Sequence, residues 1–584
     1  MHLFKGKKSL NNNHWVLLDP PMRDVMDISQ KHGVLDIIAR ILVNRQIKSD
    51  HVVNFLTPKL KNLMPDPFHF KDMVKAVART IEAINQKQKI TVFGDYDVDG
   101  ATSSALLKRF FEALGIDISI YIPDRVLEGY GPSSGAMDIL KKKGTHLVII
   151  VDSGTTAFEA LAHAKKIGLD VIILDHHIGE PKLPEAFAIV NPNRIDETSK
   201  HTYLAAVGMS FMYVYGLIKK LKELDGKQKL PDIRQYLDLV ALGTVCDIVP
   251  LKPLNRAFIQ QGLKIMGFRD NTGMSALMDV IDIDSFPTAY HLGFLLGPRI
   301  NAGSRIDQSD LGATLLSTHD KQKAKEIAQK LDRLNTERQQ IESQMIDEAI
   351  QMVESENLQT HHVICVAKEG WHVGVIGIVA GRLKEKYNRP TLVITVDEKG
   401  IGKGSGRSIP GLDLGSAMHA AKQKGLLING GGHAMAAGLT LEKDKIKAFG
   451  QFMQTRLPDG PIKTNLTIDA SISVRGITIE LAEIIDSLAP FGPENVTPKI
   501  MIDQVQPILS KIVGKDHVSC ILKAEDKATI QAIAFRSAET PMGKYLLNPA
   551  GKRCSVVGTI KLDTWQGKKR HKLFISDVMV CDDV

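Results

Sequence analysis

Three short apolar segments, each followed directly by acidic residues, constrain the fold of this 584-residue chain more than any other feature. The segments are 90–93 (ITVF), 147–151 (LVIIV) and 171–174 (VIIL). Stretches with a helical pattern, near 101–114 and 156–167, separate them. Apolar runs that alternate with helices are typical of a parallel sheet covered by helices on both faces. We therefore expect an α/β domain in which these strands lie side by side.

Acidic residues and histidines gather where these strands are expected to end. They are Asp95, Asp97 and Asp99 after the first strand, Asp152 after the second, and Asp175, His176 and His177 after the third. The carboxyl ends of parallel strands share one edge of the sheet, so these side chains should converge there. Carboxylates packed this closely repel one another unless a cation neutralises them. The sequence therefore predicts a metal site at this edge.

The mixture of carboxylates and imidazoles narrows the choice of metal. Such ligands suit Mn²⁺ better than Zn²⁺ or Ca²⁺, whereas Mg²⁺ normally prefers oxygen alone. A fourth apolar segment, 239–245, leads into Asp247 and adds one more carboxylate. Several carboxylates on one edge suit two ions about 3.5–4 Å apart, the usual clamp for in-line attack on phosphorus.

Two other interpretations apply to the DxDxDG motif at 95–100. A solvated acidic turn or a helix N-cap needs no metal, but it leaves the acidic ends of the other two strands unexplained. An EF-hand loop needs a preceding helix and a Glu at its twelfth position. Here a predicted strand precedes the motif, and the twelfth position is Leu106. The EF-hand interpretation therefore fails.

The chain is too long for one hydrophobic core, because single cores stop growing near about 250–300 residues. We expect an α/β fold: a parallel-sheet domain, a long helix interpreted as a solvated spacer, a smaller α/β domain and a β-barrel of the OB type. The expected boundaries are 1–85 for an N-terminal helical region, 86–318 for the catalytic domain, 319–355 for the helix, 356–456 for the smaller domain and 462–584 for the barrel. A linker containing Pro and Gly at 456–461 precedes the barrel.

Composition excludes several classes of protein. The net charge of +8 is compatible with a polyanionic ligand. The chain has no apolar run of about 18 residues, as a membrane span would need, and its N-terminus lacks the apolar stretch of a signal peptide. The five cysteines are scattered without a CxxC pair, so neither a disulfide framework nor a zinc site is indicated. We expect a cytoplasmic protein.

Several motifs resemble the DHH superfamily, which is named for a triplet like that at 175–177, and the RecJ family within it. They are GDYDVDGATS (94–103), RVLEGYGP (125–132), GTVCD (243–247), GPRINAGSR (297–305) and PFGP (490–493). Three others resemble the DHHA1 domain: GWHVGVIGIVAG (370–381), SGR (405–407) and GGGH (430–433). The resemblance covers roughly residues 30–584, in the domain order of the family.

The resemblance implies two divalent cations, Mn²⁺ or Mg²⁺, and a set of ligands. One ion would be held by Asp97, Asp152, His176 and Asp247, and the other by Asp95 and a shared Asp152. The implied catalytic residues are Asp97, Asp152, His177 and Arg305, with His177 against the scissile phosphate. Some relatives have a His directly before the GD of the first motif, where this chain has Phe93.

The resemblance also implies a substrate-binding surface. Its residues are Arg125, Arg299, Asn301, Arg305, Ser405, Arg407, Gly431, Gly432 and His433. Arginine binds phosphate through two parallel hydrogen bonds, and glycine lets backbone N–H groups approach phosphate closely. Basic residues at 552–572 surround Trp565 in the predicted barrel, a pattern that fits a groove for a nucleic-acid backbone with one stacking ring, although a solvated hairpin is the simpler interpretation.

The function implied is a single-stranded-DNA-specific 5′-to-3′ exonuclease in DNA repair and recombination, with a RecQ-type helicase and a single-strand-binding protein as partners. Two alternatives stay open. One is a DHH–DHHA1 phosphodiesterase that acts on short oligoribonucleotides or cyclic dinucleotides. The other is a non-catalytic DNA-binding scaffold, although such a protein would be expected to lose ligands that this chain retains.

Overall fold

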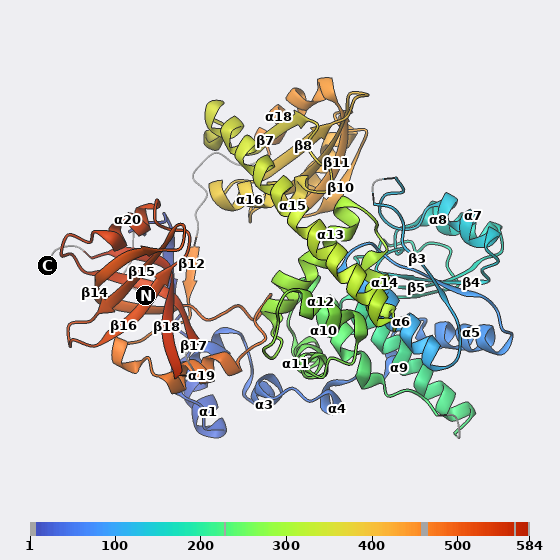
Figure 1. The fold of residues 1–584 in the computed structure, drawn as a ribbon, viewed down its shortest axis with the longest axis horizontal. Helices are drawn as coiled ribbons and strands as arrows, with labels where there is room; N and C mark the ends of the chain where they lie inside the picture. The colour runs from blue at the N-terminus through green and yellow to red at the C-terminus, as the bar shows by residue number, and fades with distance from the viewer. Residues whose placement is uncertain (1–6, 126, 227–228, 457–464, 566–567, 582–584) are drawn as a thin grey trace. The chain divides into compact units, whose positions relative to one another are not determined.

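The structure is a computed structural model that describes residues 7–125, 127–226, 229–456, 465–565 and 568–581. The chain forms two compact units (Figure 1). Unit 1 comprises Met1–Met64, Ile248–Gln260 and Pro461–Val584, and unit 2 comprises Pro65–Asp247 and Gln261–Gly460. Within the described residues, no helix is long and apolar enough to cross a membrane.

Unit 2 begins with the predicted parallel sheet, whose strand order is β3-β2-β4-β5-β6. The strands are β2 (Ile90–Phe93), β3 (Ser119–Tyr121), β4 (Leu147–Val151), β5 (Asp170–Leu174) and β6 (Ala188–Val190). The surrounding helices are α5 (Met73–Asn85), α6 (Val98–Ala113), α7 (Ser134–Lys142), α8 (Phe158–Lys166), α9 (Ala206–Leu224) and α10 (Leu237–Cys246). Helices α7 and α8 cover one face, and α5, α6 and α9 lie on the other (Figure 1). Both faces are therefore buried, which explains the uninterrupted apolar runs.

The register of this sheet aligns the ends of its central strands. Phe93 lies opposite Ile150, and Val151 lies opposite Leu174. The residues that follow β2, β4 and β5 therefore leave the sheet at one edge, as predicted. The segment that ends at Asp247 is helix α10, and Asp247 is its C-cap.

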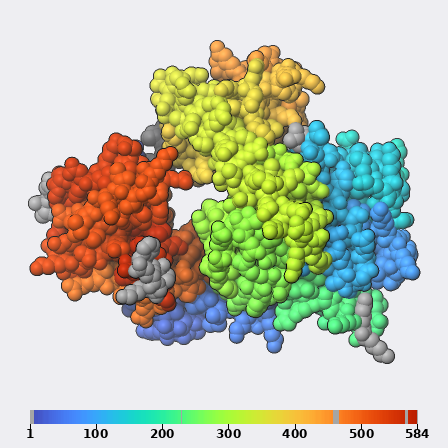
Figure 2. Space-filling view, in the orientation of Figure 1, coloured from blue at the N-terminus to red at the C-terminus, as the bar shows by residue number. Residues whose placement is uncertain are grey.

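A group of helices completes this part of unit 2. They are α12 (Thr272–Val280), the π-helix η4 (His291–Leu296), α13 (Gly297–Ile306), α14 (Leu311–Ser317) and α15 (Lys321–Ser355). The long helix is confirmed, but its interpretation as a solvated spacer is wrong. One side of α15 is exposed (Figure 2), while Leu331, Met345, Ala349 and Val353 on the other are buried. Its second half packs against α16 (Ile376–Tyr387), so α15 joins the two parts of unit 2 through a shared core.

The smaller α/β part of unit 2 is a mixed sheet with strand order β10-β11-β9-β8-β7. The strands are β7 (Ile364–Glu369), β8 (Thr391–Val396), β9 (Ile401–Arg407), β10 (Asn429–His433) and β11 (Ala436–Glu442). Helices α16, α17 (Leu414–Gln423) and α18 (Ile446–Gln454) accompany them. The glycine-rich segment thus forms an edge strand, β10, which pairs only with β11 among the described strands.

Unit 1 contains the predicted barrel. Its strands are β14 (Ile500–Val513), β15 (His517–Lys523), β16 (Thr529–Ala534), β17 (Cys554–Trp565) and β18 (Lys568–Val580), and pairing of β14 with β17 closes the order β14-β15-β16-β18-β17. The short strand β13 (Ala470–Ser471) and helices α19 (Ile479–Ser487) and α20 (Pro541–Leu547) complete it. This closed arrangement of five strands confirms the OB type.

The N-terminal segment belongs to the same unit as the barrel. Its helices are α1 (Met22–His32), α2 (Asp36–Asn44), α3 (Val52–Leu56) and α4 (Leu60–Leu63). The region expected to be helical also contains a strand, β1 (His14–Leu17), which pairs in parallel with β12 (Asn465–Ile468). Val25, Ile38 and Phe55 share one core with barrel residues such as Val518 and Leu573.

A fully buried arginine, Arg256, organises the centre of unit 1. It lies on α11 (Pro253–Gly267), and its guanidinium packs 3.9 Å from the ring centroid of Phe55. It donates hydrogen bonds to four backbone carbonyls, those of Phe55, Leu488, Ala489 and Pro490. Burial lowers the pKa of Arg256 to about 9. The PFGP motif is therefore fixed in place by this side chain.

Candidate active site

The backbone at the edge of the parallel sheet turns so that carboxylates point inward. Asp97 is the N-cap of α6, and its Oδ1 accepts hydrogen bonds from the N–H groups of Asp99 (2.9 Å) and Gly100 (3.1 Å). A Cβ at Gly100 would lie 2.4 Å from the carbonyl oxygen of Asp95, so only glycine fits. Asp152 has a positive φ of 62°, a conformation that non-glycine residues adopt rarely and mostly at functional sites.

Three overlapping groups of side chains have ligand atoms within 4.8 Å of one another. They are Asp95–Asp97–Asp152, Asp99–His176–Asp247 and Asp152–His176–His177. Nε2 of His176 lies 3.2 Å from Oδ1 of Asp152 and 3.6 Å from Oδ2 of Asp247. The structure thus brings together all five predicted metal ligands, with Asp152 and His176 shared between groups.

Three ligand atoms of this cluster lack a hydrogen-bond partner among the described residues. Oδ1 of Asp95, Nε2 of His176 and Oδ2 of Asp247 are buried and have no hydrogen-bond partner among the described residues. Burial and the neighbouring Asp97 carboxylate raise the pKa of Asp95 and of Asp152 well above the ordinary value. Burial lowers the pKa of His176 to about 4, which favours the neutral imidazole that binds metal. A buried carboxylate cluster with free lone pairs fits divalent cations.

Asp99 is a neighbour of this cluster that sequence reasoning did not select as a ligand. Its Oδ2 lies 3.8 Å from Nε2 of His176, yet its carboxylate also accepts hydrogen bonds from the N–H groups of Ala206 (2.6 Å) and Val207 (2.8 Å). Burial, followed by repulsion from Asp97, raises the pKa of Asp99 to about 7. Asp99 therefore fixes the start of α9 beside the cluster.

Asp175 orients the second histidine of the DHH triplet. Its carboxylate accepts hydrogen bonds from Nδ1 of His177 (2.7 Å) and from the N–H (3.1 Å) and hydroxyl (2.6 Å) of Thr155. Burial would raise the pKa of Asp175, but the bond from His177 holds it well below the ordinary value. Burial opposes protonation of His177, yet Asp175 prevails and raises its pKa to about 9. The hydroxyl of Tyr130 approaches Nε2 of His177 at 3.2 Å.

Phe93 lies away from this cluster. It is fully buried among residues of β4, β5, α7 and α8, and its ring stacks on Tyr121 with centroids 5.5 Å apart. The residue that takes the place of a histidine in some relatives is therefore part of the sheet's core in this chain.

Three arginines gather beside the acidic cluster. The guanidinium of Arg125 lies 4.5 Å from the ring centroid of Tyr96, and Nη1 of Arg305 donates to the carbonyl of Gly374 (2.8 Å). Burial, followed by repulsion from Arg125, lowers the pKa of Arg305 to about 9 and also lowers that of Arg407. Nη1 of Arg407 donates to the hydroxyl of Ser405 (3.1 Å). Cations that repel one another in a buried place suit an anionic ligand.

Arg299 does not join this group. Its Nε donates to Asp332 on α15 (2.8 Å), and its Nη1 donates to the carbonyl of Leu295 (2.8 Å). The structure thus gives Arg299 a partner that fixes α13 against α15, and a role in substrate binding stays a prediction. Oδ1 of Asn301, by contrast, is buried with no hydrogen-bond partner among the described residues.

The glycines of strand β10 differ in how much space a side chain would have. Gly432 has a φ of 148°, and a Cβ there would lie 2.3 Å from the carbonyl oxygen of Ala436. At Gly431 nothing lies within 4 Å of the corresponding position. His433 is exposed at the end of β10, and its charge contributes to lowering the pKa of His176. The end of this strand therefore lies near the metal cluster.

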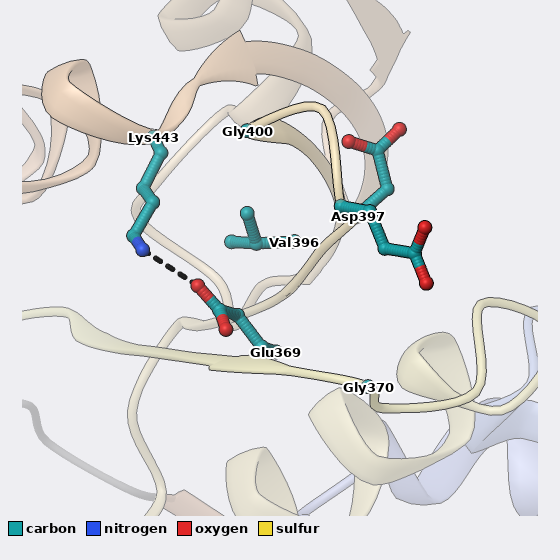
Figure 3. Close-up of a pocket in the computed structure, with 7 residues that line it drawn as sticks. Glu369, Gly370, Val396, Asp397, Gly400 and Lys443 are labelled. Carbon is teal, nitrogen blue, oxygen red and sulfur yellow. Dashed lines mark hydrogen bonds and ion pairs between the residues drawn. The ribbon is translucent and has the colours of Figure 1, made fainter.

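Two hollows lie near these elements. One, of about 550 Å³, is lined by the end of α13, including Arg305, and by Trp371, His372 and Lys403. The other, of about 360 Å³, is lined by Glu369, Asp397, Glu398 and Lys443, with Lys443 paired to Glu369 at 2.6 Å (Figure 3). Three carboxylates against one lysine disfavour phosphate, so the second hollow does not extend the site.

The barrel carries the predicted basic residues, but two of them are paired. Lys572 pairs with Asp563 and Lys569 pairs with Glu483, each at 2.5 Å, so these two charges are partly neutralised within the barrel. The side chain of Trp565 lies outside the described residues.

Sequence reasoning missed an aromatic cluster on the outside of the barrel. The ring of Phe535 meets those of His517 and Phe574 edge-on, each at 5.1 Å. In OB-folds the surface near the second and third strands, here β15 and β16, commonly binds oligonucleotides. The alternation of Val518 inside and His517 outside is the signal that could have revealed this cluster.

Comparisons with known proteins agree with this architecture. Three family models match: the DHH family, N-terminal domain (residues 89–244), the DHHA1 domain (359–458) and the RecJ OB domain (468–577). The single-stranded-DNA-specific exonuclease RecJ of Bacillus subtilis is 34% identical over 576 residues, which cover 97% of this chain and 71% of that protein. The protein of the same name from Escherichia coli is 33% identical over 504 residues, which cover 83% of this chain and 86% of that protein.

A solved structure matches nearly the whole chain. It is RecJ from Thermus thermophilus in complex with Mn²⁺, with a TM-score of 0.81 and 26% sequence identity. The match covers 98% of this chain and 80% of the other. The same protein in complex with Mg²⁺ matches with a TM-score of 0.76.

Proposed function

The chain belongs to the RecJ family of single-stranded-DNA-specific exonucleases, and from this premise we propose how its own residues hold metal and DNA. It is a metal-dependent exonuclease that hydrolyses phosphodiester bonds in single-stranded DNA, with Mn²⁺ or Mg²⁺ as cofactor.

One observation carries the proposed metal site: buried ligand atoms of Asp95, His176 and Asp247 that have no hydrogen-bond partner among the described residues. We assign Asp97, Asp152, His176 and Asp247 to one ion, and Asp95 with the shared Asp152 to the other. Asp99, held by two backbone N–H groups, acts as a positioning residue. When bound, the ions supply Lewis-acid activation of the phosphodiester and of the attacking water.

Two side chains would contact the scissile phosphate. His177 is oriented through Nδ1 by Asp175, and its Nε2, now 3.2 Å from the Tyr130 hydroxyl, would donate a hydrogen bond to a phosphate oxygen instead. Arg305 uses one nitrogen to anchor on Gly374 and offers the rest of its guanidinium. Charge-assisted bonds of this kind stabilise a phosphate by about 1.5–3 kcal/mol each.

A 5′-terminal phosphate would bind between Arg125, Ser405 and Arg407. A Cβ added to Gly377, in the first turn of α16, would lie 3.0 Å from Oγ of Ser405 and 3.1 Å from Nη2 of Arg407. The N-terminus of α16 is thus beside both side chains, and helix N-termini favour anions. A 5′-phosphate bound there would favour 5′-to-3′ digestion.

The barrel would hold the strand further from the site, through the aromatic cluster around Phe535, the basic segment 552–572 and Trp565. By family resemblance, the proposal places the enzyme in cytoplasmic DNA repair and recombination, beside a RecQ-type helicase and a single-strand-binding protein.

The test is digestion of single-stranded DNA labelled at one end or the other, with Mn²⁺ or Mg²⁺ and with a duplex as control. Early release of a mononucleotide from the 5′-labelled strand supports the proposed polarity, and early release from the 3′ end contradicts it. Faster turnover of short oligoribonucleotides or cyclic dinucleotides would favour the phosphodiesterase alternative. Binding without any cleavage in either metal would favour the scaffold.

A further inference from the structure

Two aromatic rings stand exposed on one helix of unit 2. Tyr290 is 60% exposed and Phe294 is 68% exposed. Their rings stack with centroids 5.1 Å apart and planes inclined by 23°. Large exposed apolar rings that lie together mark a binding surface more often than they mark a neutral one. The active site described above does not involve these two rings.

The helix that carries these rings leads to the active site. The π-helix η4 runs directly into α13, and π-helical turns are frequent at functional sites. Pro298, Asn301 and Arg305 follow one another at intervals of three and four residues, which places them on one face of α13. Phe294 lies in η4, one turn before Pro298. At a rise of no more than about 1.5 Å per residue, Phe294 and Arg305 lie no more than about 16 Å apart along the helix axis.

An adjoining side of the same helical segment is fixed beside a proposed metal ligand. Sγ of Cys246 donates to the carbonyl of Leu292 (3.4 Å), and a Cβ at Gly297 would lie 2.5 Å from that sulfur. Cys246 directly precedes Asp247 in the chain. The exposed rings are therefore carried by a helix whose position relative to the acidic cluster is set by close packing.

Asn301 supplies an independent observation on the face between the rings and Arg305. Its Oδ1 is buried and has no hydrogen-bond partner among the described residues. A buried amide oxygen without a donor is costly, so a ligand that brings a donor to this place would be favoured. The N–H groups on base edges supply such donors, and DNA bases also present flat π-faces to aromatic rings.

We propose that Tyr290 and Phe294 form a stacking platform for bases of single-stranded DNA on the 3′ side of the scissile phosphate. The strand would pass Asn301 and Arg305 before reaching the metal cluster. This inference rests on the proposed function, because it takes Arg305 as a contact of the scissile phosphate. A protein partner on the same rings is the competing occupant.

The experiment compares the double variant Tyr290→Leu/Phe294→Leu with the intact enzyme on long and short 5′-phosphorylated oligothymidylates. Leucine keeps apolar bulk at exposed positions but removes the π-face, so the melting temperature should not change. We expect the KM for a long strand to rise about tenfold for each ring lost, with kcat retained. Turnover of a dinucleotide, too short to reach the rings, should be unchanged. The matched control is Phe268→Leu, a ring 70% exposed and outside this face, which should change nothing.

A second measurement locates the platform on the DNA. A single abasic site is moved along the strand, and the affinity of the catalytically inactive Asp97→Ala protein for each strand is measured. At one or two positions the abasic site should weaken binding about tenfold, and in the added presence of the two leucine substitutions that loss should vanish. An unchanged KM for the long strand, or an abasic profile that the leucines leave unaltered, overturns the platform and points to a protein partner. If the intact enzyme does not hydrolyse the dinucleotide, the result contradicts the proposed function instead.

Discussion

Both units bury charged groups, but they treat them in opposite ways. In unit 1, Arg256 is enclosed and each of its three guanidinium nitrogens donates to a backbone carbonyl. In unit 2, Asp95, His176 and Asp247 have buried ligand atoms that make no hydrogen bond with any of the described residues. A satisfied buried charge stabilises a fold, whereas an unsatisfied cluster is tolerated because a ligand completes it. Whether buried polar atoms are satisfied therefore separates structural charge from functional charge in this chain.

Asp152→Asn should produce the largest effect on activity. The substitution removes a shared ligand, and turnover should fall by at least about a thousandfold, since a single electrostatic stabiliser is already worth about 10²–10³ in kcat. The melting temperature without metal should not fall, because one repelling carboxylate is gone. Both are measured on Mn²⁺-loaded and metal-free protein, with the surface residue Asp138→Asn as control. Retention of a tenth of the original turnover, with metal content verified, would contradict the assignment.

Arg256→Leu should produce the largest effect on stability. It leaves four buried carbonyls without their donor, so unit 1 should lose about 3–5 kcal/mol of unfolding free energy. Turnover of a dinucleotide should persist, because every proposed catalytic residue lies in unit 2. Urea unfolding monitored together with dinucleotide hydrolysis separates the two outcomes. If Arg256→Leu lowers stability and dinucleotide turnover to the same degree, Arg256 is not purely structural and the distinction between the two units fails.

The metal-free enzyme should become less stable as pH rises from about 6 to 8. Burial and repulsion raise the pKa of Asp95, Asp152 and Asp247, and that of Asp99 to about 7. A carboxyl group whose folded pKa is raised stabilises the fold below its unfolded pKa, and this stability is lost as pH rises through the folded value. Mn²⁺ should therefore raise the melting temperature by several degrees more at pH 8 than at pH 6. Calorimetry with and without chelator measures both effects. If the metal-induced change in melting temperature is the same at pH 6 and pH 8, the carboxylates of the cluster do not repel one another as inferred.

Two glycines of β10 should likewise differ, one serving the fold and the other the binding of substrate. Gly432→Ala places a Cβ against the carbonyl of Ala436 and should cost about 1–3 kcal/mol of stability. Gly431→Ala meets nothing in the chain, so stability should stay within about 0.5 kcal/mol while the KM for DNA rises a few fold. Thermal unfolding and steady-state kinetics of the pair give the answer. Identical behaviour of the two variants would remove Gly431 from the substrate surface.

The sequence predicted the parallel sheet and its acidic edge because strands buried on both faces leave continuous apolar runs. Residues 90–93 and 147–151 are β2 and β4 to the residue. The different roles of Asp99 and Asp175 could not be predicted. Both are aspartates near a strand end. Only the structure shows that the N–H of Ala206 holds Asp99, whereas the imidazole of His177 holds Asp175.

The sequence also could not predict which residues pack against the N-terminal helices. Periodic residues such as Val34, Ile38 and Ile41 show that one face is buried, but not what buries it. In the structure that partner is the barrel, more than 400 residues away in the chain. Removal of the barrel, residues 462–584, would therefore expose this apolar face.

The shared core of unit 1 has a consequence for synthesis of the protein on the ribosome. Helices α1 to α3 emerge first, yet the strands that cover them emerge roughly four hundred residues later. At about 5–20 residues per second, the interval is about 20–80 s. During this time Val25, Ile38 and Phe55 lack the barrel side chains that complete their core, while unit 2 can already fold. The apolar face of these helices therefore stays uncovered until the barrel strands have been translated.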